Sequence, residues 1–119
     1  MKPLRQELVL TRAVHNAAIY LLAQQAHVDP LQVLAMPIDR RDQPREQWRR
    51  AMKMRRAAVY VTLTLFNLPQ SHIAACLGVS REAVRQMVMR AQEESDDDLD
   101  YALEQLAFLN HGAAHEEQP

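Results

Sequence analysis

The sequence predicts an all-α fold of about five to six helices within a single domain. Only 2 of the 119 residues are glycine, and β-branched residues rarely follow one another, which is unfavourable for hairpins and sheets. Long stretches rich in alanine, leucine, glutamine, arginine and methionine favour helix instead. A chain of this length can build one hydrophobic core. We therefore expect one helical domain over residues 1–110 and a mobile tail over residues 111–119.

The first helix is predicted from Leu4 to Ala26, because apolar residues recur there at helical spacing without an internal proline or glycine. Its apolar arc is wider than the single stripe that a surface helix needs. The arc comprises Leu4, Leu8, Val9, Leu10, Ala13, Val14, Ala17, Ala18, Ile19, Tyr20, Leu21 and Leu22. We therefore expect this helix either to be central to the core or to be shared with a second copy in a homodimer.

Prolines mark the starts of the next two predicted helices. Asp29 suits the N-cap and Pro30 the first residue of a short helix that ends near Ala35. Pro44 suits the first turn of a second long helix, which runs to about Asn67. The predicted core stripe of this second long helix comprises Trp48, Met52, Val59, Leu63 and Phe66.

One side of the second long helix is basic. Its side chains follow one another at spacings of four, four and three residues and therefore stack, as Arg45, Arg49, Lys53 and Arg56. Like charges in this arrangement repel each other by roughly a few tenths of a kcal/mol per pair. We therefore expect an anionic partner on this side. The alternative is that these charges only coat a solvated helix face.

The stretch from Leu68 to Arg90 has the pattern of a helix-turn-helix over residues 69–90, in which two short helices cross around a tight turn. Ala74 is the small residue that such a crossing needs. Gly78 can take the left-handed backbone that ends the first short helix, and Ser80 suits the N-cap of the second. The residues expected to be buried are Ile73, Leu77, Val79, Val84 and Met87.

The side chains left outward on the second short helix suit the major groove of double-stranded DNA, where arginine reads guanine and glutamine reads adenine. We expect base contacts from Ser80, Arg81, Glu82, Arg85, Gln86 and Met89, and phosphate contacts from Arg45, Arg49, Arg50, Lys53, Arg56 and Arg90. The predicted function is sequence-selective DNA binding by a transcriptional regulator. The alternative is a protein-interaction adaptor or anti-repressor that uses the same surface or the acidic C-terminal segment.

A wider pattern is carried by Arg55, Ala58, Tyr60, Asn67, Leu68, Ile73 and Gly78. In these residues the stretch 38–90 resembles the C-terminal DNA-binding domain of the bacterial replication initiator DnaA, a relative of the Trp-repressor group. The resemblance implies a basic loop and a long helix ahead of the motif, with Arg49 and Arg50 as contacts to the DNA backbone. The family's Asp-His-Thr sequence is replaced here by Ser80-Arg81-Glu82-Ala83, and no Gly-rich phosphate loop is present. We therefore do not expect a full replication initiator.

Charge is strongly segregated along the chain. Residues 40–90 carry 11 basic and 3 acidic side chains, a local net charge of +8, whereas residues 91–119 carry 9 acidic and no basic ones. Such segregation is typical of a polyanion-binding surface followed by an acidic segment. A last helix is predicted from its N-cap Ser95, through Asp96, Asp97 and Asp98, to about Asn110, packing through Leu99, Ala102, Leu103 and Leu106. The acidic stretch from Glu93 to Asp100 is either a solvated helix start or a segment that competes for the basic side or contacts a protein.

Residue types typical of catalysis or metal binding are present without the necessary spacing. The histidines are not paired with cysteine or carboxylates at ligand spacing on a common helix face: His15, His27, His72, His111 and His115. No Ser-His-Asp or paired-carboxylate arrangement emerges either. We therefore expect a non-enzyme without metal or cofactor. Cys76 suits a small buried side chain, with a redox-sensing thiol as the alternative. The most apolar window is too short to span a bilayer, so a cytoplasmic protein is expected.

Overall fold

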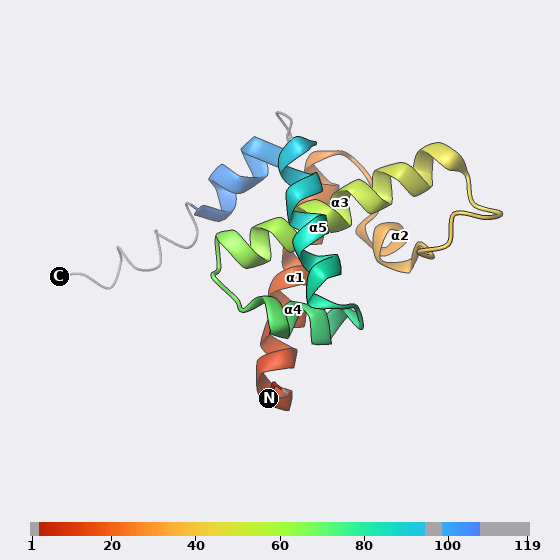
Figure 1. The fold of residues 1–119 in the computed structure, drawn as a ribbon. Coiled ribbons are helices and arrows are strands. Elements are labelled where there is room, and N and C mark those ends of the chain that lie inside the picture. The colour runs from red at the N-terminus through yellow and green to blue at the C-terminus, as the bar shows by residue number, and fades with distance from the viewer. Residues whose placement is uncertain (1–2, 95–98, 108–119) are drawn as a thin grey trace.

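The computed structural model describes residues 3–94 and 99–107, and within these ranges it contains helices and no strand. The helices are α1 (Arg5–Gln25), α2 (Pro30–Ala35), α3 (Arg45–Thr64), α4 (Gln70–Leu77) and α5 (Arg81–Glu93), and residues 99–107 are also helical. Helix α3 crosses the middle of the molecule and packs against both α1 and α5 (Figure 1). The predicted all-α class is confirmed.

The ends of α1 and α2 are held by local hydrogen bonds. Asp29 is the N-cap of α2, as predicted, and its carboxylate accepts a hydrogen bond of 3.0 Å from the backbone N–H of Leu31. Helix α1 ends in a turn that the sequence did not reveal, because His27 takes a left-handed backbone with φ of 58°. The N–H of Val28 then donates to the carbonyl of Ala23 at 2.8 Å. Histidine thus occupies a position where glycine is usual.

Helix α3 is shorter than predicted at both ends. Pro44 is its N-cap and lies outside the helix, whereas it was expected in the first turn. At the other end the helix stops at Thr64, three residues before Asn67. Asn67 has a φ of 54°, a left-handed conformation that asparagine tolerates better than most residues. The chain reverses here, and the N–H of Leu68 donates to the carbonyl of Thr62 at 3.3 Å.

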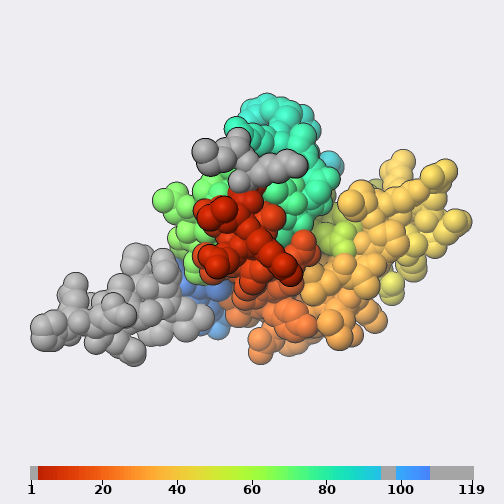
Figure 2. Space-filling model, turned by 90° about the horizontal axis from the view of Figure 1, so that it is seen from below, coloured from red at the N-terminus to blue at the C-terminus, as the bar shows by residue number. Residues whose placement is uncertain are grey.

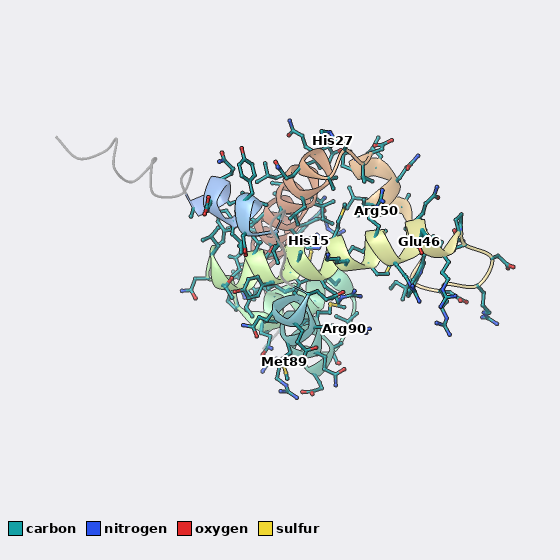
Figure 3. All side chains as sticks on the ribbon, turned by 90° about the horizontal axis from the view of Figure 1, so that it is seen from above. His15, His27, Glu46, Arg50, Met89 and Arg90 are labelled. Atoms are coloured by element: carbon teal, nitrogen blue, oxygen red, sulfur yellow. The ribbon has the colours of Figure 1, made fainter. Side chains whose placement is uncertain are left out.

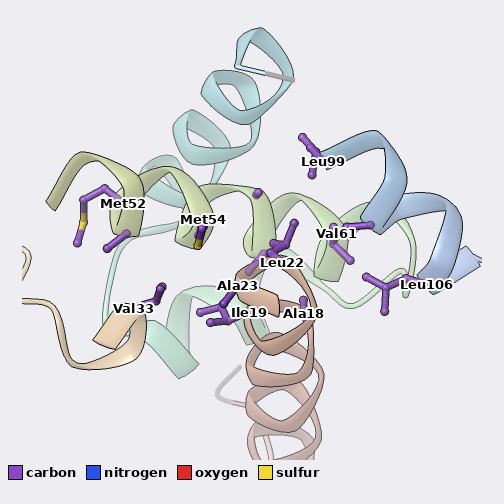
Figure 4. Packing of buried hydrophobic residues seen from close by; sticks show 14 residues of the cluster. Ala18, Ile19, Leu22, Ala23, Val33, Met52, Met54, Val61, Leu99 and Leu106 are labelled. Carbon is purple, nitrogen blue, oxygen red and sulfur yellow. The ribbon is translucent and has the colours of Figure 1, made fainter. Parts of the chain in front are cut away.

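The main core lies where α3 meets α1, α2 and the helical residues 99–107 (Figure 4). Of the predicted stripe on α3, Met52 and Val59 are buried, whereas Trp48, Leu63 and Phe66 are only partly buried. The sequence missed further buried residues on this helix, namely Ala51, Met54, Ala57, Ala58, Val61 and Thr62. The physical reason is that α3 is covered on two sides, by α1 and by α5, whereas a single stripe describes a helix covered on one.

The loop between α2 and α3 is attached to α3 by a tryptophan. The indole N–H of Trp48 donates to the carbonyls of Pro37 and Ile38, at 3.0 and 3.2 Å. Within the loop the guanidinium of Arg41 pairs with the carboxylate of Asp39 at 2.8 Å, although both side chains are largely exposed. The loop therefore has a defined position beside the first turns of α3.

Helix α1 is half core and half surface. Its C-terminal half buries Ala18, Ile19, Leu22 and Ala23, so the prediction of a central helix is confirmed for this part. Its N-terminal half protrudes, and Figure 2 shows its first turns at the front of the molecule when seen from below. The side chains of Leu4, Val9, Leu10 and Tyr20 are 66%, 63%, 56% and 46% exposed. An apolar surface therefore remains on α1 within a single copy.

The C-terminal helical residues pack as predicted where they are described. Leu99, Ala102 and Leu106 are buried and Leu103 is partly buried against the main core. The predicted N-cap at Ser95, the residues Asp96 to Asp98, the helix end near Asn110 and the tail 111–119 lie outside the described residues.

Candidate nucleic-acid interface

Helices α4 and α5 form the predicted helix-turn-helix. Gly78 ends α4 in a left-handed conformation with φ of 70°, and the N–H of Val79 donates back to the carbonyl of Ala74 at 3.0 Å. Ser80 is the N-cap of α5, and its hydroxyl accepts a hydrogen bond of 3.0 Å from the N–H of Ala83. Three residues thus connect the two helices, and Gly78 and Ser80 have the roles that the sequence predicted for them.

A second hydrophobic cluster holds this unit against α3. Ile73, Ala74 and Val84 are buried in it together with Val59 of α3. Leu77, Val79 and Met87 were also expected to be buried, and they are partly buried against the same cluster. The small side chain of Ala74 is 6% exposed, which fits the predicted close approach of the two helices. The orientation of α5 therefore depends on packing against α3, not on the turn alone.

The outer face of α5 consists of the residues assigned to base contacts. All of them are exposed: Ser80, Arg81, Glu82, Arg85, Gln86 and Met89. The hydroxyl oxygen of Ser80 is at the same time occupied by its capping bond. The remaining five side chains carry a mixture of hydrogen-bond donors and acceptors together with one thioether.

Glu82 contacts two of these side chains, Arg85 and Gln86, and Arg85 in turn contacts Met89. Oε2 of Glu82 accepts from Nε of Arg85 at 3.0 Å, and its Oε1 accepts from Nη2 of the same guanidinium. The amide of Gln86 lies 3.5 Å from Oε1, at the outer limit of a hydrogen bond. The sulfur of Met89 accepts from Nη1 of Arg85 at 3.4 Å. The hydrogen bonds from Arg85 hold the pKa of the Glu82 carboxyl below its ordinary value, so this side chain is an anion at neutral pH.

On the basic side of α3, some cationic side chains are exposed and one is held in an ion pair. Arg45 and Arg49 are exposed, whereas Lys53 and Arg56 are partly buried. The guanidinium of Arg56 makes a two-pronged ion pair with Glu94 at the end of α5, with both N–O distances at 2.7 Å. Hydrogen bonding to Arg56 lowers the pKa of the Glu94 carboxyl, and the charges of Arg90 and Lys53 act in the same direction. Glu94 therefore neutralises part of the surface predicted to contact phosphate.

Arg50 lies off the line of the stack, although it lines a pocket together with Lys53 and Glu94. It follows Arg49 by one residue, which is a rotation of about 100° around the helix axis. Figure 3 shows Arg50 on the side of α3 that faces α1 and α2, whereas Arg90 and Met89 lie on the other side. Arg50 also lines a second pocket, of about 420 Å³, together with His27 of the turn after α1. The phosphate contacts predicted for the two neighbouring arginines thus lie about 100° apart around the helix.

A groove of about 510 Å³ runs between α3 and the helix-turn-helix. Apolar side chains of three elements line it, with Met52 from α3, Leu77 from α4 and Met87 from α5. It also gathers four guanidinium groups, those of Arg12, Arg55, Arg56 and Arg90. The positive charge next to α5 is therefore higher than the predicted phosphate contacts alone would produce.

Two of these four arginines were not predicted as site residues. The guanidinium of Arg12 on α1 donates to the carbonyl of Cys76 at 2.9 Å, near the end of α4. That of Arg55 donates to the carbonyl of Leu34 at 2.6 Å, near the end of α2. Each bond orients one guanidinium toward a helix end, where a positive charge complements the helix dipole. No spacing in the sequence links Arg12 to α5, because helical periodicity relates only residues on one helix.

A buried histidine lies beside this groove. His15 is 7% exposed, and its Nδ1 is 3.3 Å from the side-chain oxygen of Asn16. Burial lowers the pKa of the His15 imidazole, and the hydrogen bond to Asn16 opposes that shift. The positive charges of Arg55 and Arg12 lower it further, so the imidazole is neutral at pH 7.

The other candidate ligands are dispersed in the described part of the chain. His72 lies 3.5 Å from the carboxylate of Glu7, His27 is exposed and Cys76 is buried. Residues 3–94 and 99–107 contain no group of three histidine, cysteine or acidic side chains placed to hold a metal ion. His111 and His115 lie outside these ranges.

No family model, curated protein or solved structure matches the chain. None of its described helices is both long and apolar enough to cross a membrane. What defines the molecule is thus its own architecture, a helix-turn-helix with a polar outer face that is packed against a basic helix.

Proposed function

We propose that this chain binds double-stranded DNA sequence-selectively through α5 and acts as a transcriptional regulator. The observation that carries the proposal is the outer face of α5, where Arg81, Arg85 and Gln86 are exposed on the helix that follows the turn. The N-terminal part of such a helix enters the major groove, where these side chain types pair with base edges. The resemblance to the DnaA C-terminal domain supports the same function. The direct test is selection of bound duplexes from a random pool, with recovery of a defined sequence motif as the expected result.

The distribution of charge supports the same partner. Arg90 lies on α5 itself, and α3, which packs against α5, carries Arg45, Arg49, Arg55 and Arg56, so phosphates beside a bound major groove have cationic neighbours. A protein-interaction adaptor is the competing function. Stable capture of a protein partner, with no duplex bound even at low salt, would favour the adaptor and contradict DNA binding.

The basic side of α3 is tested by the salt dependence of binding. Each phosphate contact contributes about 0.9 to the slope of log affinity against log salt concentration. We expect the double variant Arg45→Gln/Arg49→Gln to lower this slope by about 1.8 and to weaken cognate and random duplexes alike. The measurement is a fluorescence-anisotropy titration at several salt concentrations.

Arg50→Gln is the matched comparison, since it removes the same charge from the same helix on the side that faces α2. We expect it to change the slope less than Arg49→Gln does. An equal change would show that the interface extends around α3 as the resemblance implies. An unchanged slope in the double variant would exclude Arg45 and Arg49 from the DNA interface.

The ion pair between Arg56 and Glu94 is expected to reduce DNA affinity, because it occupies a guanidinium beside α5. Glu94→Gln should therefore bind cognate and random duplexes more tightly, with a salt slope steeper by about 0.9 if Arg56 then contacts a phosphate. The variant should lose at most about 1 kcal/mol of stability, as expected for a partly exposed pair. Because the folded-state pKa of Glu94 is lowered, the pair stabilises the fold above pH 4.5, its ordinary value, and this contribution is lost as the pH falls further.

Glu93→Gln is the control for this experiment, because it removes one negative charge from the adjacent, exposed position on α5. Equal gains in affinity from the two variants would show that net charge alone is responsible. A loss of affinity in Glu94→Gln would mean that Arg56 needs Glu94 to hold it in place.

We further propose that two copies associate through α1. The exposed apolar strip on this helix comprises Val9, Leu10, Ala13, Ala17 and Tyr20, and it is flanked by the exposed Arg5 and Arg12. Small alanines in the middle allow a second helix to approach closely, and an antiparallel two-fold pair would place the larger residues of one copy against those of the other.

Ala13→Glu should convert a dimer into a monomer in sedimentation experiments. Ala75→Glu, on an exposed alanine of α4, should not; a wild-type monomer at every concentration tested would contradict the pairing.

A further inference from the structure

Arg85 is held on the outer face of α5 from two directions. The Glu82 carboxylate, one turn before it, accepts two hydrogen bonds from Nε and Nη2. The sulfur of Met89, one turn after it, accepts from Nη1 at 3.4 Å. A long arginine side chain that would otherwise sample many rotamers thus has one preferred position before any ligand binds.

The hydrogens that remain on this guanidinium are specific in their arrangement. A guanidinium has five N–H donors in a rigid planar fork. Glu82 occupies the edge formed by Nε and Nη2, and Met89 takes one of the two hydrogens on Nη1. The outer end of the group, where one hydrogen of Nη1 and one of Nη2 are parallel to each other, is not used by Glu82.

Two parallel donors select one base in the major groove. Guanine presents two adjacent acceptors there, O6 and N7. Adenine presents one acceptor beside an amino donor, cytosine presents an amino donor, and thymine presents one acceptor beside a methyl group. Only guanine satisfies both donors at once.

We infer that Glu82 is a positioning residue that fixes Arg85 to read a guanine, so that the target sequence contains a guanine opposite this point of α5. The inference rests on the proposed function and makes it more specific. Both carboxylate oxygens of Glu82 are engaged by Arg85, one of them also lying near Gln86, so the first role of this acid is to orient its neighbours. A negative charge facing DNA is unfavourable unless it orients a neighbour in this way or itself accepts a hydrogen bond from a base.

The test replaces each guanine of the selected duplex in turn by its 7-deaza analogue, which lacks the N7 acceptor and keeps Watson–Crick pairing. For the wild-type protein, one position should lose roughly 2- to 12-fold in affinity, half the free energy of one bidentate contact, because the O6 acceptor remains. In Arg85→Ala the same substitution should cause no further loss. In Glu82→Gln the loss should become much smaller, although Arg85 is still present.

Glu93→Gln serves as the control for the removed charge and should keep the full wild-type loss. Because Glu82 is exposed, Glu82→Gln should keep the wild-type melting temperature, so a change in guanine dependence reports positioning and not unfolding. A wild-type guanine dependence that persists undiminished in Glu82→Gln would overturn the inference while leaving DNA binding intact. If Glu82→Gln lost base discrimination only at a cytosine, the inference would also be overturned, because Glu82 would then contact a base itself. Failure of the wild-type protein to bind any duplex would instead contradict the proposed function.

Discussion

We expect Ile73→Ala to lower the free energy of unfolding by about 2–5 kcal/mol. Ile73 is 1% exposed in the cluster that joins α4 and α5 to Val59 of α3. Truncation removes three carbons from this packing and leaves a cavity that its neighbours can fill only in part. The slightly higher helix propensity of alanine offsets only a few tenths of a kcal/mol, roughly. Chemical denaturation followed by circular dichroism measures the change.

The matched control is Leu31→Ala on α2, where the leucine is 61% exposed. This substitution should stay within about 0.5 kcal/mol of the wild type. If Ile73→Ala were equally mild, Ile73 would not be part of the cluster, and the orientation of α5 would be determined by other contacts. Because the cluster positions α5, the Ile73 variant should also lose sequence preference before it loses its helical content.

Arg85→Ala should weaken binding to the selected duplex by about 5- to 150-fold, since it removes one bidentate base contact. Binding to random duplexes should fall much less, because their affinity comes from phosphate contacts. The melting temperature should not change, because the side chains of Arg85 and its partner Glu82 are both exposed. Competition titrations with cognate and random duplexes measure the ratio of the two affinities directly.

Arg90→Ala provides the contrast, since Arg90 lines the groove beside α5 and is expected to contact phosphate. It should lower the affinity for both duplexes by similar factors and leave the base preference intact. Intact specificity in Arg85→Ala would remove this side chain from base readout. A loss of specificity in Arg90→Ala would instead indicate that bases are contacted from the C-terminal end of α5.

The helix-turn-helix was the part of the fold most fully predictable from sequence. Gly78, Ser80 and Ala74 have roles that depend on nearest neighbours along the chain: a left-handed backbone, a capping oxygen and a small side chain at a crossing. Such roles leave a local signature in the sequence. The end of α3 was less predictable, because the left-handed backbone of Asn67 depends on the direction that the chain takes toward α4.

By itself, therefore, the sequence determined which segments are helical, the N-caps of α2 and α5, the left-handed end of α4 and the set of side chains that face outward on α5. Only the tertiary structure decided which charges meet. It brings Arg12 of α1 into the groove that Arg90 of α5 also lines, and it pairs Arg56 with Glu94 at 2.7 Å. The physical reason is that helical periodicity relates residues three or four positions apart, whereas these contacts depend on how α1 and α5 pack against α3.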